Sequence, residues 1–181
     1  MGAILEKIEI IDFPKTMIIG KAIRMKENPG FDDDSIPSLW RRMNGDGTLK
    51  FLQNIDGCKT RKDCVGWMGD FMPGDQEYTY LAGILAEPET NIPDGFETRT
   101  IESIQMAIAW IKETDTPEGG DIICNASEIT SKALADSGYE HDFSKGFYEM
   151  EYYSFERLLQ HEITGEKKIL DYYTPCKKKQ T

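Results

Sequence analysis

Apolar and polar residues alternate in several stretches of the chain, with the two-residue period of a β-strand that buries one face. The first such stretch is 4–13, which ends at Pro14. The second, 16–25, is rich in β-branched and apolar side chains. Because only two residues separate these strands, we expect them to pair as neighbours.

A helix is predicted after the polar loop 26–34, where Ser35 is placed to cap it. Gly45-Asp46-Gly47 interrupts this helix, and Leu49, Leu52 and Ile55 suggest that it resumes. Its apolar residues recur every three or four positions, which places them on one face: Ile36, Leu39, Trp40 and Met43.

Two more strands, 64–71 and 77–85, are joined through Pro73-Gly74-Asp75, whose residues favour a turn, so they predict a hairpin. The loop 87–95, with two prolines, closes this first half of the chain.

The same order of elements then occurs a second time. The predicted elements are strands at 96–101 and 104–111, a polar loop at 114–120, a helix at 122–137, and strands at 147–155 and 168–173.

The repeated order of strand, strand, helix, strand and strand predicts an α+β fold of two tandem, pseudo-symmetric modules. We expect a single domain over 1–181, with a first module of about 3–87 and a second of about 95–175. Strands joined by short turns pair antiparallel, so the modules would form an antiparallel sheet with two main helices. A seam between two such halves is a favoured place for a central ligand cleft.

The charge balance excludes several classes of protein. Lys+Arg 21 against Asp+Glu 32 gives a net charge of −11, the wrong sign for direct binding of nucleic acid. No apolar run approaches the roughly 20 residues that span a bilayer, so we expect no membrane partner. The N-terminal residues do not resemble a secretory signal, which predicts a cytoplasmic protein.

No metal or cofactor is expected from the sequence. Its four cysteines form no Cys-x-x-Cys pair, only two histidines could complete a metal site, and free reduced thiols are the simpler interpretation. No Ser/His/Asp or Cys/His nucleophile set is present. No feature of the sequence indicates an oligomeric state.

The most informative segment is the predicted strand around 148–153. Successive side chains of a strand alternate between faces, so Glu149, Glu151 and Tyr153 share one face. If this face lines an apolar groove, its carboxylates either await a cationic ligand or act as a general acid or base. The alternative is an ordinary solvated face of an acidic protein.

The three tryptophans also allow two interpretations. Trp40, Trp67 and Trp110 could all belong to the core, where large aromatic residues contribute most. Tryptophan beside a carboxylate is also the arrangement that binds organic cations and flat aromatic molecules.

The element order and several short segments resemble the GyrI-like, AraC-type effector-binding family. This small-molecule domain also occurs at the C-terminus of multidrug-responsive transcription regulators. The resemblance covers essentially the whole chain and rests on the order and spacing of five segments: 36–40, 80–84, 92–96, 150–153 and 171–175.

The resemblance implies two tandem strand-helix-strand-strand modules with a ligand cleft between them. It also implies that a glutamate of the penultimate strand faces the bound molecule. Glu151 matches that position, with Tyr153 on the same face, although the role could move by two residues to Glu149. By position, the resemblance also implies cleft walls made by Trp40, Trp67, Trp110 and Tyr173.

The family's regulators carry a helix-turn-helix domain ahead of this module, whereas the first strand here begins at about Ile4. We therefore expect a stand-alone protein that binds small hydrophobic, aromatic or cationic molecules. One alternative is a hydrolase that opens the cyclopropane of DNA-alkylating natural products, with Glu151 activating water and Tyr153 as its hydrogen-bonding partner. Another is a protein that modulates DNA gyrase.

Overall fold

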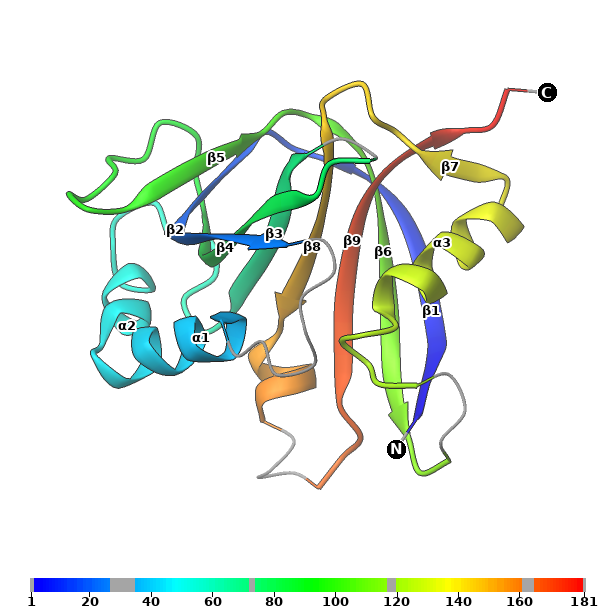
Figure 1. The fold of residues 1–181 in the computed structure, drawn as a ribbon, viewed down its shortest axis with the longest axis horizontal. Coiled ribbons are helices and arrows are strands. Elements are labelled where there is room, and N and C mark those ends of the chain that lie inside the picture. The colour runs from blue at the N-terminus through cyan, green and yellow to red at the C-terminus, as the bar shows by residue number, and fades with distance from the viewer. Residues whose placement is uncertain (1, 27–34, 72–73, 117–119, 161–164, 181) are drawn as a thin grey trace. The chain divides into compact units, whose positions relative to one another are not determined.

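The computed structural model describes residues 2–26, 35–71, 74–116, 120–160 and 165–180 (Figure 1). The fold is α+β with antiparallel strands, as predicted. The elements in chain order are β1 (Gly2–Phe13), β2 (Thr16–Lys26), α1 (Ser35–Gly45), α2 (Thr48–Leu52), β3 (Cys64–Phe71), β4 (Glu77–Ala86), β5 (Glu97–Ile101), β6 (Ile104–Thr114), α3 (Ala126–Asp136), β7 (Tyr139–His141), β8 (Phe147–Tyr153), the π-helical turn η1 (Phe155–Leu159) and β9 (Ile169–Lys178).

The chain forms two compact units that interleave along the sequence. Unit 1 consists of Met1–Phe13, Ile104–Lys145 and Glu149–Thr181, and unit 2 consists of Pro14–Ser103 and Gly146–Tyr148. The predicted modules, about 3–87 and 95–175, are divided differently. The first strand of the first half, β1, belongs to unit 1 together with the rest of the second half. The first strand of the second half, β5, belongs to unit 2 together with the rest of the first half.

Unit 1 contains the strand order β1-β6-β9-β8, and β7 pairs with β9. Helix α3 packs against β1, β6 and β9 (Figure 1). Beneath it, Leu134 meets Ala107 and Cys176 in a buried cluster, with Ile8 and Ile10 at its border. One face of these strands is therefore covered by α3, and we call it the helix face.

Unit 2 contains the order β3-β4-β2-β5, with α1 and α2 beside it. Leu39 and Met43 are the buried residues of α1, as its apolar periodicity predicts. Helix α2 resumes after Gly47, whose φ of 80° is in the left-handed region that favours glycine.

The predicted pairing of the first two strands is wrong. β1 pairs with β6, and β2 pairs with β4 and β5. Two-residue hairpin turns need a positive φ at their first central position, which Pro14 cannot adopt, so the chain continues away from β1. Residues 102–103 form a second two-residue connection, between β5 and β6. It lies beside Pro14-Lys15, as the hydrogen bond from the Lys15 amide to the Ser103 hydroxyl at 3.1 Å shows.

Two element boundaries also differ from the prediction. Helix α3 begins at Ala126 rather than at about 122, because the Asp121 side chain accepts hydrogen bonds from the amides of Ile123 and Cys124 and favours a turn there. Strand β8 ends at Tyr153 because Ser154 accepts a hydrogen bond from the Arg157 amide and starts η1. The proline of the predicted turn at 73–75 and most of the loop 26–34 lie outside the described residues.

Candidate functional site

Strand β8 carries two buried carboxylates on the helix face of unit 1. Glu149 is 7% exposed and Glu151 is 5% exposed. Tyr153 follows on the same face by strand alternation and is half-buried. The interpretation of Glu149 and Glu151 as a solvated acidic face is therefore wrong.

Side chains from three elements surround the carboxylate of Glu149, and two of them donate hydrogen bonds to it. The Ser127 hydroxyl on α3 donates to its Oε1 at 3.1 Å, and the Tyr172 phenol on β9 donates to its Oε2 at 2.6 Å. His141 of β7 places Nε2 4.0 Å from the same Oε1 and 3.2 Å from the hydroxyl of Ser131.

Tyr172 is the donor that is most deeply buried, at 2% exposure. Burial raises the pKa of Tyr172 well above its ordinary value, and the nearby charge of Glu149 raises it further. The phenol therefore keeps its proton at neutral pH and donates a hydrogen bond to the carboxylate.

Glu151 lies opposite Tyr172 in the register of β8 and β9, and its Oε2 accepts a hydrogen bond from the Tyr153 phenol. Burial raises the pKa of the Cys124 thiol, just before α3, and the charge of Asp121 adds to the effect. The charge of Glu151 also contributes to the pKa of the Cys124 thiol.

Trp110 and Tyr173 lie on the opposite face of unit 1. Tyr173 pairs with Met150, which alternates with the two glutamates along β8. The Trp110 ring already contacts two cations of the protein, because Lys7 Nζ lies 4.5 Å and the Arg157 guanidinium 5.0 Å from its centroid.

Asp171 fixes that guanidinium in place. Arg157 donates from Nε to Asp171 Oδ1 at 2.9 Å and makes a second hydrogen bond to Oδ2. The Asp171 side chain is only 2% exposed and the Arg157 side chain is 33% exposed, so the ion pair is partly buried beside Trp110. These hydrogen bonds raise the pKa of Arg157, which stays charged.

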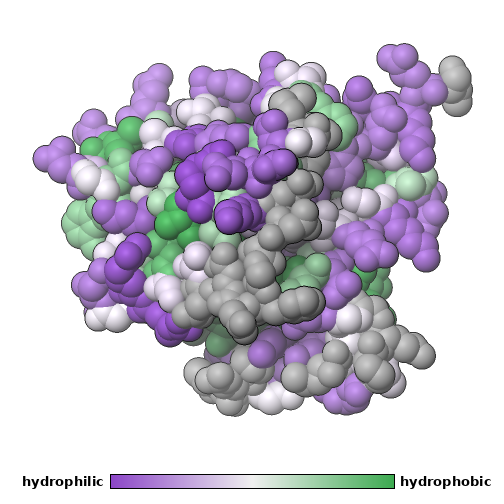
Figure 2. Space-filling view, in the orientation of Figure 1, coloured by the Kyte–Doolittle hydropathy of each residue, from purple (hydrophilic) through white to green (hydrophobic). Residues whose placement is uncertain are grey.

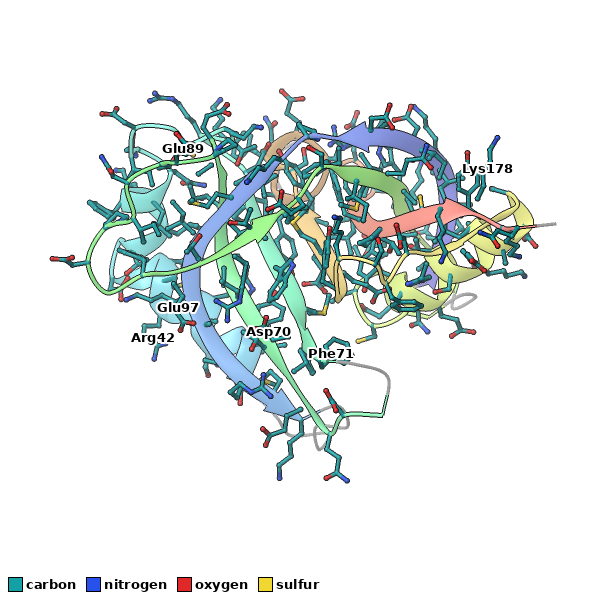
Figure 3. All side chains as sticks on the ribbon, turned by 90° about the horizontal axis from the view of Figure 1, so that it is seen from above. Arg42, Asp70, Phe71, Glu89, Glu97 and Lys178 are labelled. Carbon is teal, nitrogen blue, oxygen red and sulfur yellow. The ribbon has the colours of Figure 1, made fainter. Side chains whose placement is uncertain are left out.

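The remaining two tryptophans belong to unit 2. Trp40 donates its indole N–H to the Tyr80 phenol at 3.0 Å. Trp67 is buried, and the Arg99 guanidinium lies 5.7 Å from its ring. Arg99 is bound by Asp70, labelled in Figure 3 at the end of β3, through hydrogen bonds as short as 2.6 Å.

Among the residues predicted for the site, the structure therefore brings together Glu149, Glu151 and Tyr153. It adds Tyr172 and Ser127, which no pattern in the sequence singles out. Tyr172 could be identified only from the pairing register of β8 and β9. Ser127 could be identified only from the exact start of α3.

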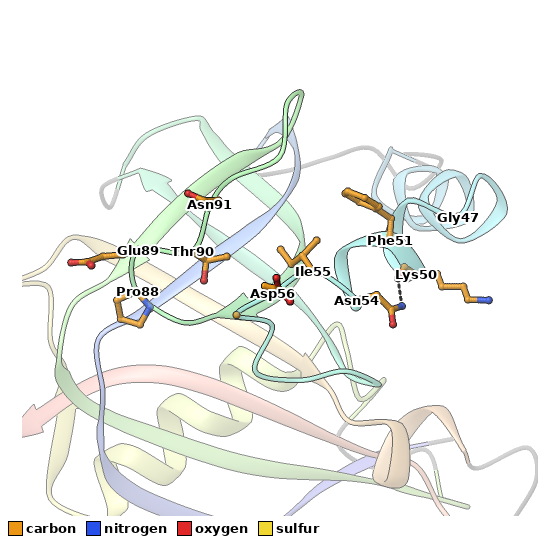
Figure 4. Close-up of a pocket in the computed structure, with 11 residues that line it drawn as sticks. Gly47, Lys50, Phe51, Asn54, Ile55, Asp56, Pro88, Glu89, Thr90 and Asn91 are labelled. Carbon is orange, nitrogen blue, oxygen red and sulfur yellow. Dashed lines mark hydrogen bonds between the residues drawn. The ribbon is translucent and has the colours of Figure 1, made fainter.

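A pocket of about 950 Å³ opens elsewhere, between α2 and the loop 88–91 of unit 2 (Figure 4). Phe51, at 52% exposure, lines it and stacks on Phe96 with a centroid distance of 5.9 Å. Every lining residue is at least partly exposed. Because no charged group is buried there, a bound cation would gain less than at Glu149 and Glu151.

Within the described part of the chain, no cluster of three or more His, Cys, Asp or Glu side chains could hold a metal ion. The four cysteines are free thiols. None of the helices in the described ranges is long and apolar enough to cross a membrane.

The model of the family described as "Cass2: Integron-associated effector binding protein" matches residues 9–176. The chain belongs to this family. The resemblance to effector-binding domains inferred from the sequence is thereby confirmed. No match is found among the curated proteins.

Solved structures that share the fold of this chain are distant in sequence. SAV2435 bound to tetraphenylphosphonium has a TM-score of 0.66 and 14% identity, covering 94% of each chain. An integron cassette protein from the mobile metagenome of Vibrio cholerae has a TM-score of 0.59 and 10% identity, covering 98% of this chain and 100% of that one. The C-terminal domain of EcmrR has a TM-score of 0.57 and 11% identity, covering 96% and 98%.

Proposed function

We propose that this effector-binding protein binds small organic cations with hydrophobic or aromatic bodies at the carboxylate face of β8, with Glu151 as the counter-charge. The observation that carries the proposal is the burial of two glutamates on one face of one strand. Two buried negative charges side by side are costly, and a bound cation offsets that cost.

The contacts of the two carboxylates suggest different roles. Glu149 is fixed by Ser127 and Tyr172 from two other elements, so it serves to position the site. Glu151 accepts a hydrogen bond from Tyr153, a half-buried neighbour on its own strand, and it is the carboxylate that we assign as the counter-charge.

The comparisons and the charge support a cationic ligand. The matching family is described by effector binding, and the ligand in the SAV2435 structure is a lipophilic cation. The net charge of −11 also raises the local concentration of cations, and hydrophilic residues predominate on the surface in Figure 2.

A thermal-shift titration tests the proposal, with tetraphenylphosphonium, a flat neutral aromatic compound and an aromatic carboxylate as probes. A cation at a hundred times its Kd adds about 2.7 kcal/mol to the free energy of unfolding, which raises Tm by several degrees. We expect this shift with the cation and not with the anion. The Glu151→Gln variant should lose at least about tenfold in cation affinity, because it keeps the shape of the side chain and removes its charge.

Glu140→Gln is the matched control, since it removes the same charge from an exposed side chain of β7 that pairs with Lys177. It should bind like the wild type. Equal affinity of wild type and Glu151→Gln would overturn the assignment of Glu151. Mass spectrometry with a cyclopropane-bearing alkylating compound as a fourth probe adds a second readout, because a gain of one water with wild type alone would instead identify a hydrolase.

A further inference from the structure

The polar groups under α3 continue beyond the two glutamates. Thr130 lies one helical turn after Ser127, and Thr174 lies two residues after Tyr172 on the same face of β9. Both threonines are 0% exposed. Neither hydroxyl has a hydrogen-bond partner among the described residues.

Such hydroxyls are costly to bury. A buried polar group left without a partner costs about 1–3 kcal/mol, and two of them occur here where α3 meets the sheet. Ser127 and Tyr172 both contact Glu149, so the two threonines extend the polar surface that begins at that carboxylate. We call Ser127, Thr130, Glu149, Tyr172 and Thr174 the polar strip.

On the helix face, the rings of Tyr153 and Tyr172 carry phenols that donate to the two glutamates. Trp110 and Tyr173 lie on the face away from the polar strip, and Trp110 is already covered by Lys7 and Arg157. A cation without N–H groups is recognised mainly by ring faces, whereas an ammonium group needs hydrogen-bond acceptors. The polar strip offers acceptors.

We propose that the site selects protonated amines with an apolar body over quaternary cations of the same charge. This inference rests on the proposed function. Because Glu151 pairs with Tyr172, Glu149 is the carboxylate level with Thr174 on β9. The ammonium N–H groups donate to Glu149 and to the hydroxyl oxygens of Thr130 and Thr174, and Glu151 adds its charge from two residues along β8. A site built to hydrogen-bond its ligand discriminates strongly against an analogue that lacks the donors, because its own polar groups then stay unpaired.

The first turn of α3 provides a route to these buried hydroxyls. Asn125 occupies the N-cap position but makes no side-chain hydrogen bond to the helix. A helix end without such a cap is weaker by about 1 kcal/mol. We therefore expect the turn that carries Ser127 to open more readily than the rest of α3, with the hydrogen bond from Ser127 to Glu149 broken as a ligand enters beneath it.

A matched pair of probes tests the selectivity: protonated 1-naphthylmethylamine and its N,N,N-trimethyl quaternary analogue. We expect calorimetric titration at pH 7 to give at least about tenfold tighter binding of the amine. In Thr130→Val and Thr174→Val, which keep the shape and remove the hydroxyl, the ratio should fall towards one while the quaternary analogue binds as before.

Thr60→Val is the control, because Thr60 also has a buried hydroxyl without a partner but belongs to unit 2. Its ratio should equal that of wild type. Equal binding of both probes by wild type, or an unchanged ratio in both strip variants, overturns the selectivity and leaves the proposed function standing. If neither probe nor tetraphenylphosphonium binds, the proposed function itself fails.

Discussion

The phenol of Tyr172 links the chemistry of the site to the stability of unit 1. It donates to Glu149 from a fully buried position, and its pKa is raised by burial and by the charge of that glutamate. A single hydroxyl therefore holds a buried carboxylate and resists losing its own proton.

Replacing Tyr172 by Phe should lower the free energy of unfolding by about 2 kcal/mol at pH 7, the usual worth of a hydrogen bond to a charged group. The pH dependence should also change. Because the folded-state pKa of Tyr172 is raised, the folded protein keeps a proton that the unfolded chain loses above about pH 10. Wild-type stability is complete below that pH and falls above it.

Urea unfolding between pH 7 and 11 measures both effects, with Tyr139→Phe as the control from the same unit. The alkaline loss should be smaller in Tyr172→Phe than in wild type and in the control. Identical slopes in all three proteins would contradict the role of Tyr172.

Residue-level prediction succeeded where a single strand was enough. The two-residue period alone places Glu149, Glu151 and Tyr153 on one face. It could not reveal Tyr172 as a partner, because the register between β8 and β9 depends on contacts distant in sequence.

Among the strands of unit 2, β2 and β4 approach each other closely at a pair of glycines. Gly20 faces Gly83 in the antiparallel register. A Cβ added at Gly83 would lie 2.1 Å from the carbonyl oxygen of Ile19 and 2.8 Å from the Cα of Gly20. Since these are backbone atoms, the strands themselves would have to move.

Gly83→Ala should therefore destabilise the fold by about 3 kcal/mol or more, through overpacking between two strands. Gly45→Ala is the control, because a Cβ at Gly45 in α1 meets no atom within 4 Å. It should change stability by less than about 1 kcal/mol, in the stabilising direction. Denaturant unfolding of both variants decides the matter, and similar losses in the two would refute the explanation.

The elements themselves were largely predictable, but the partners of the strands were not. Strand β3 matches its predicted limits of 64–71, and α1 begins at the predicted Ser35. The partner of β1 was missed because proximity in sequence favoured β2, whereas the fixed φ of Pro14 excludes the tight hairpin. That restriction is visible in the sequence, but the choice of β6 as the new partner is not.

At the scale of the whole molecule, the two halves of the sequence exchange their first strands. β1 pairs with β6 of the second half, and β5 pairs with β2 of the first. The order of elements predicts the repetition, but an order read along the chain does not distinguish exchanged strands from separate modules.

Cutting the exposed loop 87–95 tests the exchange. With a protease site inserted after Thr90, we expect the two fragments to stay together in size-exclusion chromatography, because each holds an edge strand paired to the other. Fragments produced separately should remain largely unfolded by circular dichroism. Two independently folded fragments would disprove this dependence.

The exchange also determines what happens while the chain is being made. Phe13 pairs with Ile104, and Gly2 with Thr114, so β1 leaves the ribosome long before its partner exists. At about 5–20 residues per second, the strand waits on the order of ten seconds in an unpaired state that favours aggregation. Charged residues between its apolar ones oppose such contacts. The charged residues of β1 thus act against aggregation of the nascent chain before the strand has paired: Glu6, Lys7, Glu9 and Asp12.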